Sequence, residues 1–208
     1  MGIELKKKTG INLKKGTSIS LEKKQKPITA LSIGLNWGAI PRTGMLSKVL
    51  PRKSVDLDGS VAMFAADGKV MDVVSYRKLS SYDLAIIHSG DDLIGDSFGD
   101  DGRDNETINI NLKTVNKKVQ TIVFFLNSYK MQDFASIPYS KIRIYDDENR
   151  IFATFNLSAE EKYAGYVSMV MGKIVKSSGR SWDFHAIGDP VSSKDLDSTV
   201  KLIKNVYV

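Results

Sequence analysis

Apolar and polar residues alternate with a period of two along much of this chain, and this pattern constrains the fold more than any other feature. The segments LSIGLNW (31–37) and ININL (108–112) both alternate in this way, as do strands that bury one face in a core. The segment VQTIVFFLN (119–127) is apolar almost throughout and predicts a strand buried on both faces. The chain is therefore expected to fold mainly as β-strands.

Turn signals between the apolar runs indicate how these strands pair. Asp67-Gly68 lies between the runs VAMF and VMDVVSY, and Asp-Gly in such a position is a strong hairpin signal. The polar segment DDEN (146–149) separates two further strand-like runs. Many short strands joined by such turns predict a two-sheet antiparallel β-sandwich. We expect a single domain over residues 1–208, with its core within residues 11–188.

One helix is expected at the end of the chain. Apolar residues recur there at helical spacing, at Leu196, Val200, Ile203 and Tyr207. Such spacing gives a helix one face that can pack on the sandwich. Ser192 and Ser193 precede this pattern as candidate caps, so we predict a short C-terminal helix over residues 192–206.

The residue types exclude several kinds of site. The chain has no cysteine and two histidines, which excludes a disulfide framework, a thiolate metal site and a thiol nucleophile, and argues against a histidine-rich zinc site. No apolar run reaches the roughly 18 residues of a membrane-spanning helix. The lack of cysteine suits a reducing compartment. We therefore expect a cytoplasmic protein without a transmembrane segment.

Positive charge is concentrated at the N-terminus. Residues 1–26 contain eight lysines and two glutamates, a net charge of +6 that equals the net charge of the whole chain. Such an arm can contact nucleic acid or an anionic lipid surface. It can equally be a solvated strand edge whose lysines oppose aggregation. Nucleic-acid or lipid binding through this Lys-rich arm is one alternative function.

Negative charge is concentrated in residues 88–106, which read HSGDDLIGDSFGDDGRDNE. Six aspartates and one glutamate lie there beside a single arginine, and clustered carboxylates repel one another unless a cation lies among them. A solvated loop is the simpler explanation, because aspartate and glycine favour turns. A glycine-rich loop of carboxylates also suits calcium, which takes about six to eight oxygen ligands. His88 is expected to hydrogen-bond a neighbouring carboxylate or simply to pack in the fold, because calcium avoids imidazole.

A second acidic element, DLDGS, begins at Asp56. Alternation places Asp56 and Asp58 on one face of a strand. The element resembles the nucleophile motif of haloacid-dehalogenase-type phosphatases, in which the first aspartate attacks phosphate and the second is the acid or base. That fold needs several βα units before its next acidic motif, and only 35 residues separate Asp56 from Asp91. A magnesium-dependent phosphohydrolase using Asp56 and Asp58 is the other alternative function.

Five motifs, taken in order, resemble the TerD family of tellurium-resistance proteins. They are IxLxKGxxIxL, IGLNW, VDLDGSVAMFAADGKV, the acidic segment 88–106 and GRSWDFHAIG, and they cover residues 11–188. The resemblance implies a β-sandwich that binds calcium through acidic loops. It also implies stress roles linked to tellurite, phage and colicin resistance, with no established catalysis. The chain departs from the family at Ile94, where threonine is common, and in segment 38–54, which is longer than expected.

The resemblance further implies which side chains bind the ion. The implied metal ligands are Asp56, Asp58, Asp91, Asp92, Asp96, Asp100, Asp101, Asp104, Asn105 and Glu106. Ten donors exceed the needs of one ion, so we expect one or two calcium ions. The expected direct ligands are Asp56, Asp58, Asp91, Asp100, Asp101 and Glu106. The expected function is that of a calcium-binding, non-catalytic stress-response protein whose ion-loaded loops present a surface to other proteins of a stress-resistance assembly.

Overall fold

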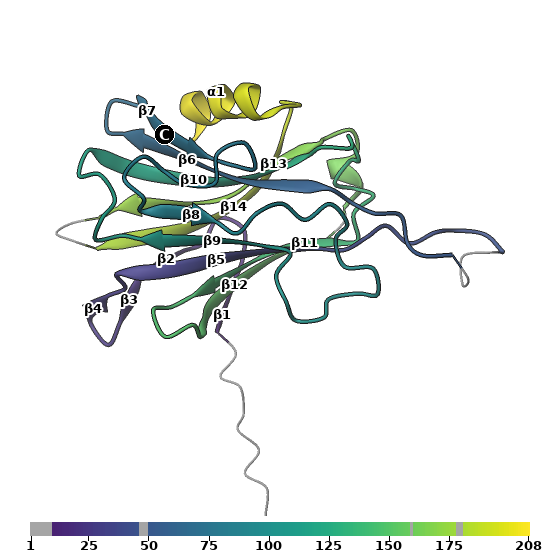
Figure 1. Cartoon of the computed structure of the whole chain (residues 1–208), viewed down its shortest axis with the longest axis horizontal. Coiled ribbons are helices and arrows are strands. Elements are labelled where there is room, and N and C mark those ends of the chain that lie inside the picture. The colour runs from purple at the N-terminus through teal and green to yellow at the C-terminus, as the bar shows by residue number, and fades with distance from the viewer. Residues whose placement is uncertain (1–9, 46–49, 159, 178–180) are drawn as a thin grey trace, which may run out of the picture.

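The computed structural model describes residues 10–45, 50–158, 160–177 and 181–208, which form two six-stranded sheets packed face to face (Figure 1). The first sheet has the spatial order β1 (Ile11–Leu13), β12 (Ile151–Ser158), β11 (Tyr139–Tyr145), β5 (Ala30–Trp37), β9 (Glu106–Asn111) and β8 (Ile86–His88). The second has the order β2 (Ser18–Ser20), β14 (Trp182–Val191), β13 (Ser168–Lys176), β10 (Val119–Ser128), β6 (Leu57–Ala65) and β7 (Val70–Val74). The predicted two-sheet β-sandwich is confirmed.

Pairing within the sheets is antiparallel with one exception. β1 runs parallel to β12, while the other neighbouring strands of both sheets are antiparallel. A separate short pair is formed by β3 (Glu22–Lys23) and β4 (Lys26–Pro27). Both predicted hairpins form: β6 pairs with β7 around Asp67-Gly68, and β11 pairs with β12 around residues 146–149.

The main hydrophobic core lies between the two sheets. Inward-facing residues such as Ile33 of β5 and Phe124 of β10 are fully buried there. The neighbours of Phe124 on the same strand, Val123 and Phe125, face the opposite side and lie in a second core. β10 is therefore buried on both faces, as its nearly continuous apolar sequence predicts.

Helix α1 (Leu196–Val206) covers the outer face of the second sheet and closes this second core (Figure 1). Val200 and Ile203 pack against the sheet at the expected spacing. Ser192 and Ser193 are not the cap. The helix begins at Leu196, because the Asp195 carboxylate accepts a hydrogen bond from the backbone N–H of Ser198 at 2.8 Å and closes a capping box.

A short 3-10 helix, η1 (Glu161–Tyr163), follows β12. Of the described residues, none belongs to a helix long and apolar enough to cross a membrane. The first nine residues of the Lys-rich arm lie outside the described residues. In the described part, Lys15 pairs with Asp189 at 2.5 Å and Lys23 with Asp146 at 2.9 Å, so some of the arm's charge is neutralised within the fold.

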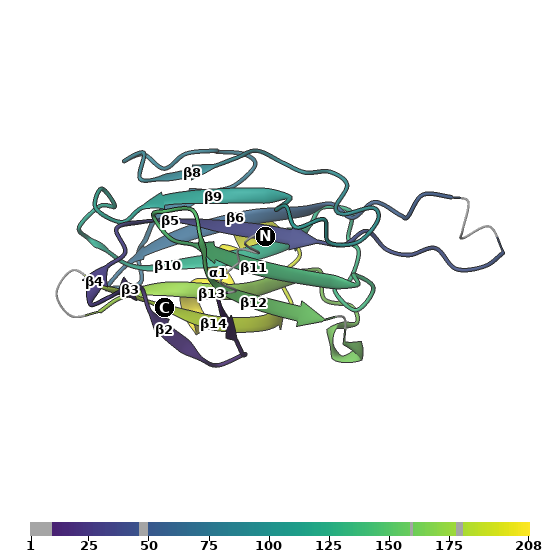
Figure 2. The ribbon, with the colours of Figure 1, turned by 90° about the horizontal axis from the view of Figure 1, so that it is seen from below.

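Two long connections leave the same end of the sandwich. Between β5 and β6, the described residues 41–45 and 50–53 extend away from the sheets in both views (Figures 1 and 2). Backbone hydrogen bonds between Ile40 and Lys53 hold the base of this connection together. Residues 89–105 join β8 to β9 and carry the acidic segment back over the sandwich. The candidate site lies along this second connection.

Candidate metal site

The acidic connection between β8 and β9 is attached to both sheets by its backbone. The N–H of Val55, just before β6, donates to the Ile94 carbonyl at 2.9 Å. The N–H of Asp96 donates to the Trp37 carbonyl, at the end of β5, at 2.9 Å. The bond to Val55 holds the earlier half of the connection beside the sheet that contains β6. The bond to Trp37 holds the later half beside the sheet that contains β5. Carboxylates that are distant in sequence therefore meet.

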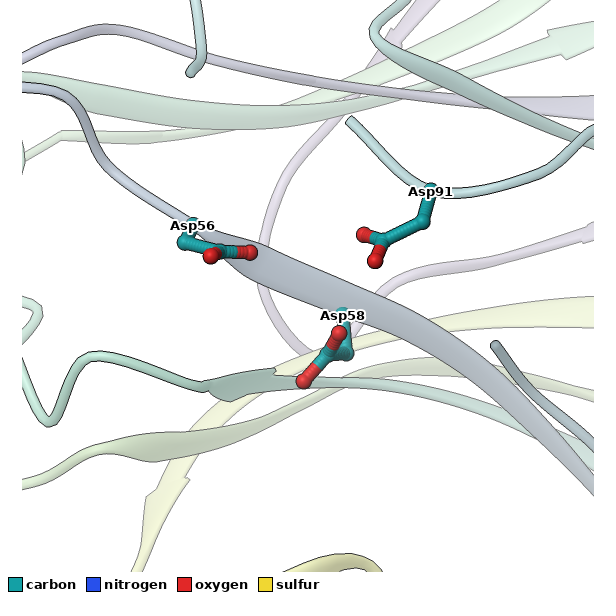
Figure 3. A group of neighbouring side chains, drawn as sticks. All are labelled: Asp56, Asp58 and Asp91. Carbon is teal, nitrogen blue, oxygen red and sulfur yellow. The ribbon is translucent and has the colours of Figure 1, made fainter. Parts of the chain in front are cut away.

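Asp56, Asp58 and Asp91 form the first acidic group. Each offers a carboxylate oxygen, and these oxygens lie within 4.8 Å of one another. Asp56 and Asp58 are carried by the chain entering β6, and Asp91 faces them from the separate loop (Figure 3). Asp56 is 3% exposed and Asp58 5% exposed, while Asp91 is exposed. The DLD element and the acidic segment thus lie together, at a site open to solvent on the Asp91 side.

The first group has too little positive charge around it. Burial raises the pKa of Asp58 from 3.8 to about 7, and the charges of Asp91, Asp56 and Glu106 add to this effect. Burial also raises the pKa of Asp91, with the Asp56 charge as a further cause. The Asp56 Oδ1 atom is buried and has no hydrogen-bond partner. Buried carboxylate oxygens normally have partners, so this environment favours a bound cation.

Asp96, Asp100 and Asp101 form a second acidic group, whose oxygens also lie within 4.8 Å of one another. In contrast to the first group, all three of its carboxylates accept hydrogen bonds from the protein, and Asp101 accepts its bond from the Arg103 N–H at 2.8 Å. Asp96 accepts hydrogen bonds from Asn36 at 2.9 Å and from the Tyr139 hydroxyl at 2.6 Å. Asp101 is exposed. The second group is therefore shallower and better neutralised than the first.

Most of the side chains that donate to the second group or to the neighbouring Asp104 come from one face of β11. Tyr139, Lys141, Arg143 and Tyr145 alternate along this strand and face the acidic connection. Arg143 binds Asp100 and Asp104 at 2.6 Å each, and Lys141 also pairs with Asp100. Burial would raise the pKa of Asp100, but the hydrogen bonds from Lys141 and Arg143 outweigh it and lower the pKa to about 2.

Asp104 lies directly on the sheet rather than in either acidic group. Its carboxylate binds Arg143 and accepts a hydrogen bond from the Tyr145 hydroxyl at 2.6 Å. Gly34 of β5 allows this approach, because a Cβ atom at Gly34 would lie 2.1 Å from the Asp104 carboxylate. Asp104 is therefore expected to hold the connection on the first sheet rather than to bind an ion directly.

Glu106 also lies outside both groups, although it was expected to be a direct ligand. Its Oε2 atom accepts a hydrogen bond from the Gly59 N–H at 2.8 Å, and the Gly59 carbonyl lies 3.1 Å from His88 Nε2. The pairing of β6 with β7 reaches only to Val61, so Glu106 and His88 bind backbone groups at the open edge of β6. His88 Nε2 also lies 3.3 Å from Glu106 Oε2, so His88 packs beside a carboxylate, while its hydrogen-bond partner at this nitrogen is the Gly59 carbonyl.

The remaining two predicted ligands shape the loop. Asp92 accepts hydrogen bonds from the N–H groups of Ile94 and Gly95 at 2.9 and 2.8 Å, which closes a tight turn. Asn105 accepts one from the Trp37 N–H at 2.8 Å and so continues the edge of β5. Of the ten predicted ligands, the structure thus gathers six into two groups and places Asp92, Asp104, Asn105 and Glu106 in supporting contacts.

One basic residue at the site has no signal in the local sequence. Lys130 follows β10, and its Nζ atom lies 3.2 Å from Asp56 Oδ2 and 3.0 Å from the Leu93 carbonyl. Its position depends on the pairing of β10 beside β6, which places the Tyr129 N–H on the Asp56 carbonyl at 3.0 Å. Only the three-dimensional fold brings Lys130 to the acidic group.

Comparison with known proteins now identifies the family. The TerD domain matches residues 9–201 of the chain. The chain belongs to the TerD family. Its relatives include the tellurium resistance protein TerZ of Serratia marcescens, 30% identical over 84% of this chain and 87% of TerZ. They also include the stress response protein SCP2 of Bacillus subtilis, 32% identical over 86% of this chain and 91% of SCP2.

Solved structures show that proteins of low sequence identity share this fold. The crystal structure of SAV2460, a protein of unknown function, has a TM-score of 0.65 at 18% identity and covers 85% of this chain and 97% of its own. A homologue of the telluride resistance protein TerD from Streptomyces coelicolor has a TM-score of 0.62 at 16% identity, with 85% and 95% covered. The resemblance of DLDGS to haloacid-dehalogenase-type phosphatases loses its structural basis, because β6 lies in an antiparallel sheet rather than among βα units.

Proposed function

We propose that this TerD-family protein binds calcium at Asp56, Asp58 and Asp91 and acts as a non-catalytic stress-response protein. The observation that carries the proposal is the state of the first acidic group. Three carboxylates converge, two of them buried, and the Asp56 Oδ1 atom has no partner. A divalent cation among these oxygens removes their mutual repulsion and satisfies the unpaired oxygen.

The donor set favours calcium over other metals. The group offers carboxylate oxygens, and the chain has no cysteine for a thiolate site. Hard oxygen donors suit calcium and magnesium, and calcium accepts irregular geometry with more ligands. The site combines a fixed strand with a glycine-containing loop, so its geometry is irregular. Calcium is therefore the ion that fits best.

A second ion is proposed at Asp96, Asp100 and Asp101. Because Lys141 and Arg143 already neutralise Asp100, this group should attract a cation less strongly than the first. Asp92, Asp104, Asn105 and Glu106 then hold the loop in place rather than binding the ions. Binding at the first group would tie the loop to β6, and this ordered surface is the one we propose for protein partners of a stress-resistance assembly.

The non-catalytic part of the proposal is supported by the relatives, whose names describe resistance and stress response. The cytoplasm is retained as the expected compartment, which cell fractionation would test. Contact of the Lys-rich arm with nucleic acid or lipid is the alternative function. It predicts salt-sensitive binding of nucleic acid or lipid that is lost when residues 1–8 are deleted.

The test is a calorimetric titration of chelator-treated protein with calcium and, separately, with magnesium. We expect calcium to bind more tightly, and calcium at a hundredfold excess over Kd to stabilise the fold by about 2.7 kcal/mol, a rise in Tm of about 5–10 °C. Asp56→Asn should abolish the tighter binding. The matched control is Asp147→Asn, an exposed aspartate in the β11–β12 turn. Absence of binding at millimolar calcium would refute the proposal.

A further inference from the structure

Lys130 is the one basic side chain, within the part of the chain that the structure describes, that forms an ion pair with the first acidic group. Its Nζ atom lies 3.2 Å from Asp56 Oδ2 and donates a hydrogen bond to the Leu93 carbonyl at 3.0 Å. It is also close enough for its charge to act on Asp91. The ammonium group thus contacts, or lies beside, the oxygens that a hard cation would use.

The position of Lys130 is set by the fold, although its side chain is 42% exposed. The Tyr129 N–H is bound to the Asp56 carbonyl at 3.0 Å, which fixes the neighbouring backbone beside the group. From there the long side chain reaches the carboxylate from the solvent side. A lysine is a compact, strongly hydrated charge on a flexible stem, so it can leave the site without any change in the sheets.

We infer that the Lys130 ammonium group occupies the acidic site in the metal-free protein, so that a divalent ion must either displace this group or bind beside it. The inference rests on the proposed calcium site and deepens it by naming the residue that sets its affinity. In the absence of calcium, the ammonium group partly neutralises Asp56 and Asp91. When calcium binds, the same positive charge opposes it. Lys130 therefore keeps the metal-free protein folded and at the same time weakens calcium binding.

This arrangement predicts opposite effects of one substitution on two measurements. In chelator, Lys130→Gln should lower the Tm, because the carboxylates lose their counter-charge. With calcium titrated calorimetrically, the same variant should bind on the order of tenfold more tightly, because the competing charge is gone. A merely structural lysine would not produce this pair of effects, since loss of structure would weaken calcium binding as well.

Three further variants make the test specific. Lys130→Arg keeps the charge and should retain a Kd within about threefold of the original, by the same electrostatic reasoning. Lys130→Glu adds a carboxylate and should bind calcium more tightly than Lys130→Gln. Lys118→Gln removes the same charge just before the opposite end of β10, a strand about 30 Å long at about 3.3 Å per residue, and should leave both the Tm and the Kd unchanged.

The outcomes separate this inference from the calcium proposal. If the original protein and all variants fail to bind calcium, the proposed calcium site is wrong and the inference falls with it. If all bind with the same Kd, calcium binding stands and the role of Lys130 is refuted. If Lys130→Gln binds more weakly, the lysine supports the site instead of competing for it, and the inference is equally refuted.

Discussion

Replacing Asp58 with asparagine should stabilise the calcium-free protein at neutral pH while removing its ability to bind the ion. Asp58 is nearly fully buried beside other carboxylates, and its pKa is raised from 3.8 to about 7, first by burial and then by Asp91, Asp56 and Glu106. A raised carboxylate pKa means that the folded protein holds this proton more tightly than the unfolded chain. The resulting stability is fully present below pH 3.8 and is lost as the pH rises to about 7.

The size of the effect follows from the same pKa. Moving from 3.8 to about 7 corresponds to about 4 kcal/mol of lost stability above pH 7, as an upper limit. Because neighbouring carboxylates titrate together with Asp58, a single substitution recovers only part of this. We expect Asp58→Asn to stabilise the calcium-free protein by about 2 kcal/mol at pH 8, a rise in Tm of about 4–8 °C.

The assay is urea unfolding in chelator at pH 5 and pH 8, followed by Trp37 and Trp182 fluorescence. At pH 5 the folded protein still holds the Asp58 proton but the unfolded chain has already lost it, so the substitution should stabilise the protein by less than half as much as at pH 8. At pH 8 the variant should be the more stable protein. Asp147→Asn serves as the control and should be neutral at both values. A variant that is less stable than the original at pH 8 would refute the electrostatic account of this site.

Three other predictions follow from contacts at the same end of the molecule. Calcium binding should release a proton at pH 6 and tighten as the pH rises to about 7, because Asp58 must ionise; calorimetry in buffers of different ionisation enthalpy measures this, and a flat profile contradicts it. Gly59→Ala should cost about 1–3 kcal/mol in urea unfolding, because its Cβ would lie 2.4 Å from Glu106 Oε2; an unchanged midpoint contradicts the close packing. Arg143→Met should cost about 3 kcal/mol in the same assay by leaving Asp104 buried without its cation, and a neutral result would show that the pair is dispensable.

Strand positions and hairpins were accessible from the sequence because they depend on local patterns. Period-two alternation identified β5 and β9, and Asp67-Gly68 identified the β6–β7 turn. The helix was expected to start at Ser192 or Ser193, because serine is a good N-cap. Aspartate is an equally good N-cap, so the sequence alone does not choose between these residues. In the structure the N-cap is Asp195, which forms a reciprocal capping box with Ser198. The extent of a single domain over residues 1–208 stays a prediction.

The roles of the acidic residues were only partly accessible. Glu106 was grouped with the aspartates because the resemblance to the TerD family implied it, although the alternation of β9 gives a different signal. Glu106, Ile108 and Ile110 share one face of that strand and are all buried. A carboxylate in register with core residues is more suited to binding backbone groups inside the fold than to a solvent-accessible ion. Lys130, in contrast, could not be found, because its contact with Asp56 depends on long-range strand pairing.

The two acidic groups differ in how their charge is balanced, and this difference should set the order in which they bind calcium. At the second group, Asp100 is bound by Arg143 and Lys141, of which Arg143 is 7% exposed and fixed on β11. At the first group, the sole ion-pairing cation among the described residues is the flexible Lys130. Displacing a mobile, half-exposed lysine costs less than separating a buried arginine from its carboxylate. Calcium should therefore fill the Asp56 group first, so Asp56→Asn should remove the tighter phase of a titration and leave any weaker phase in place.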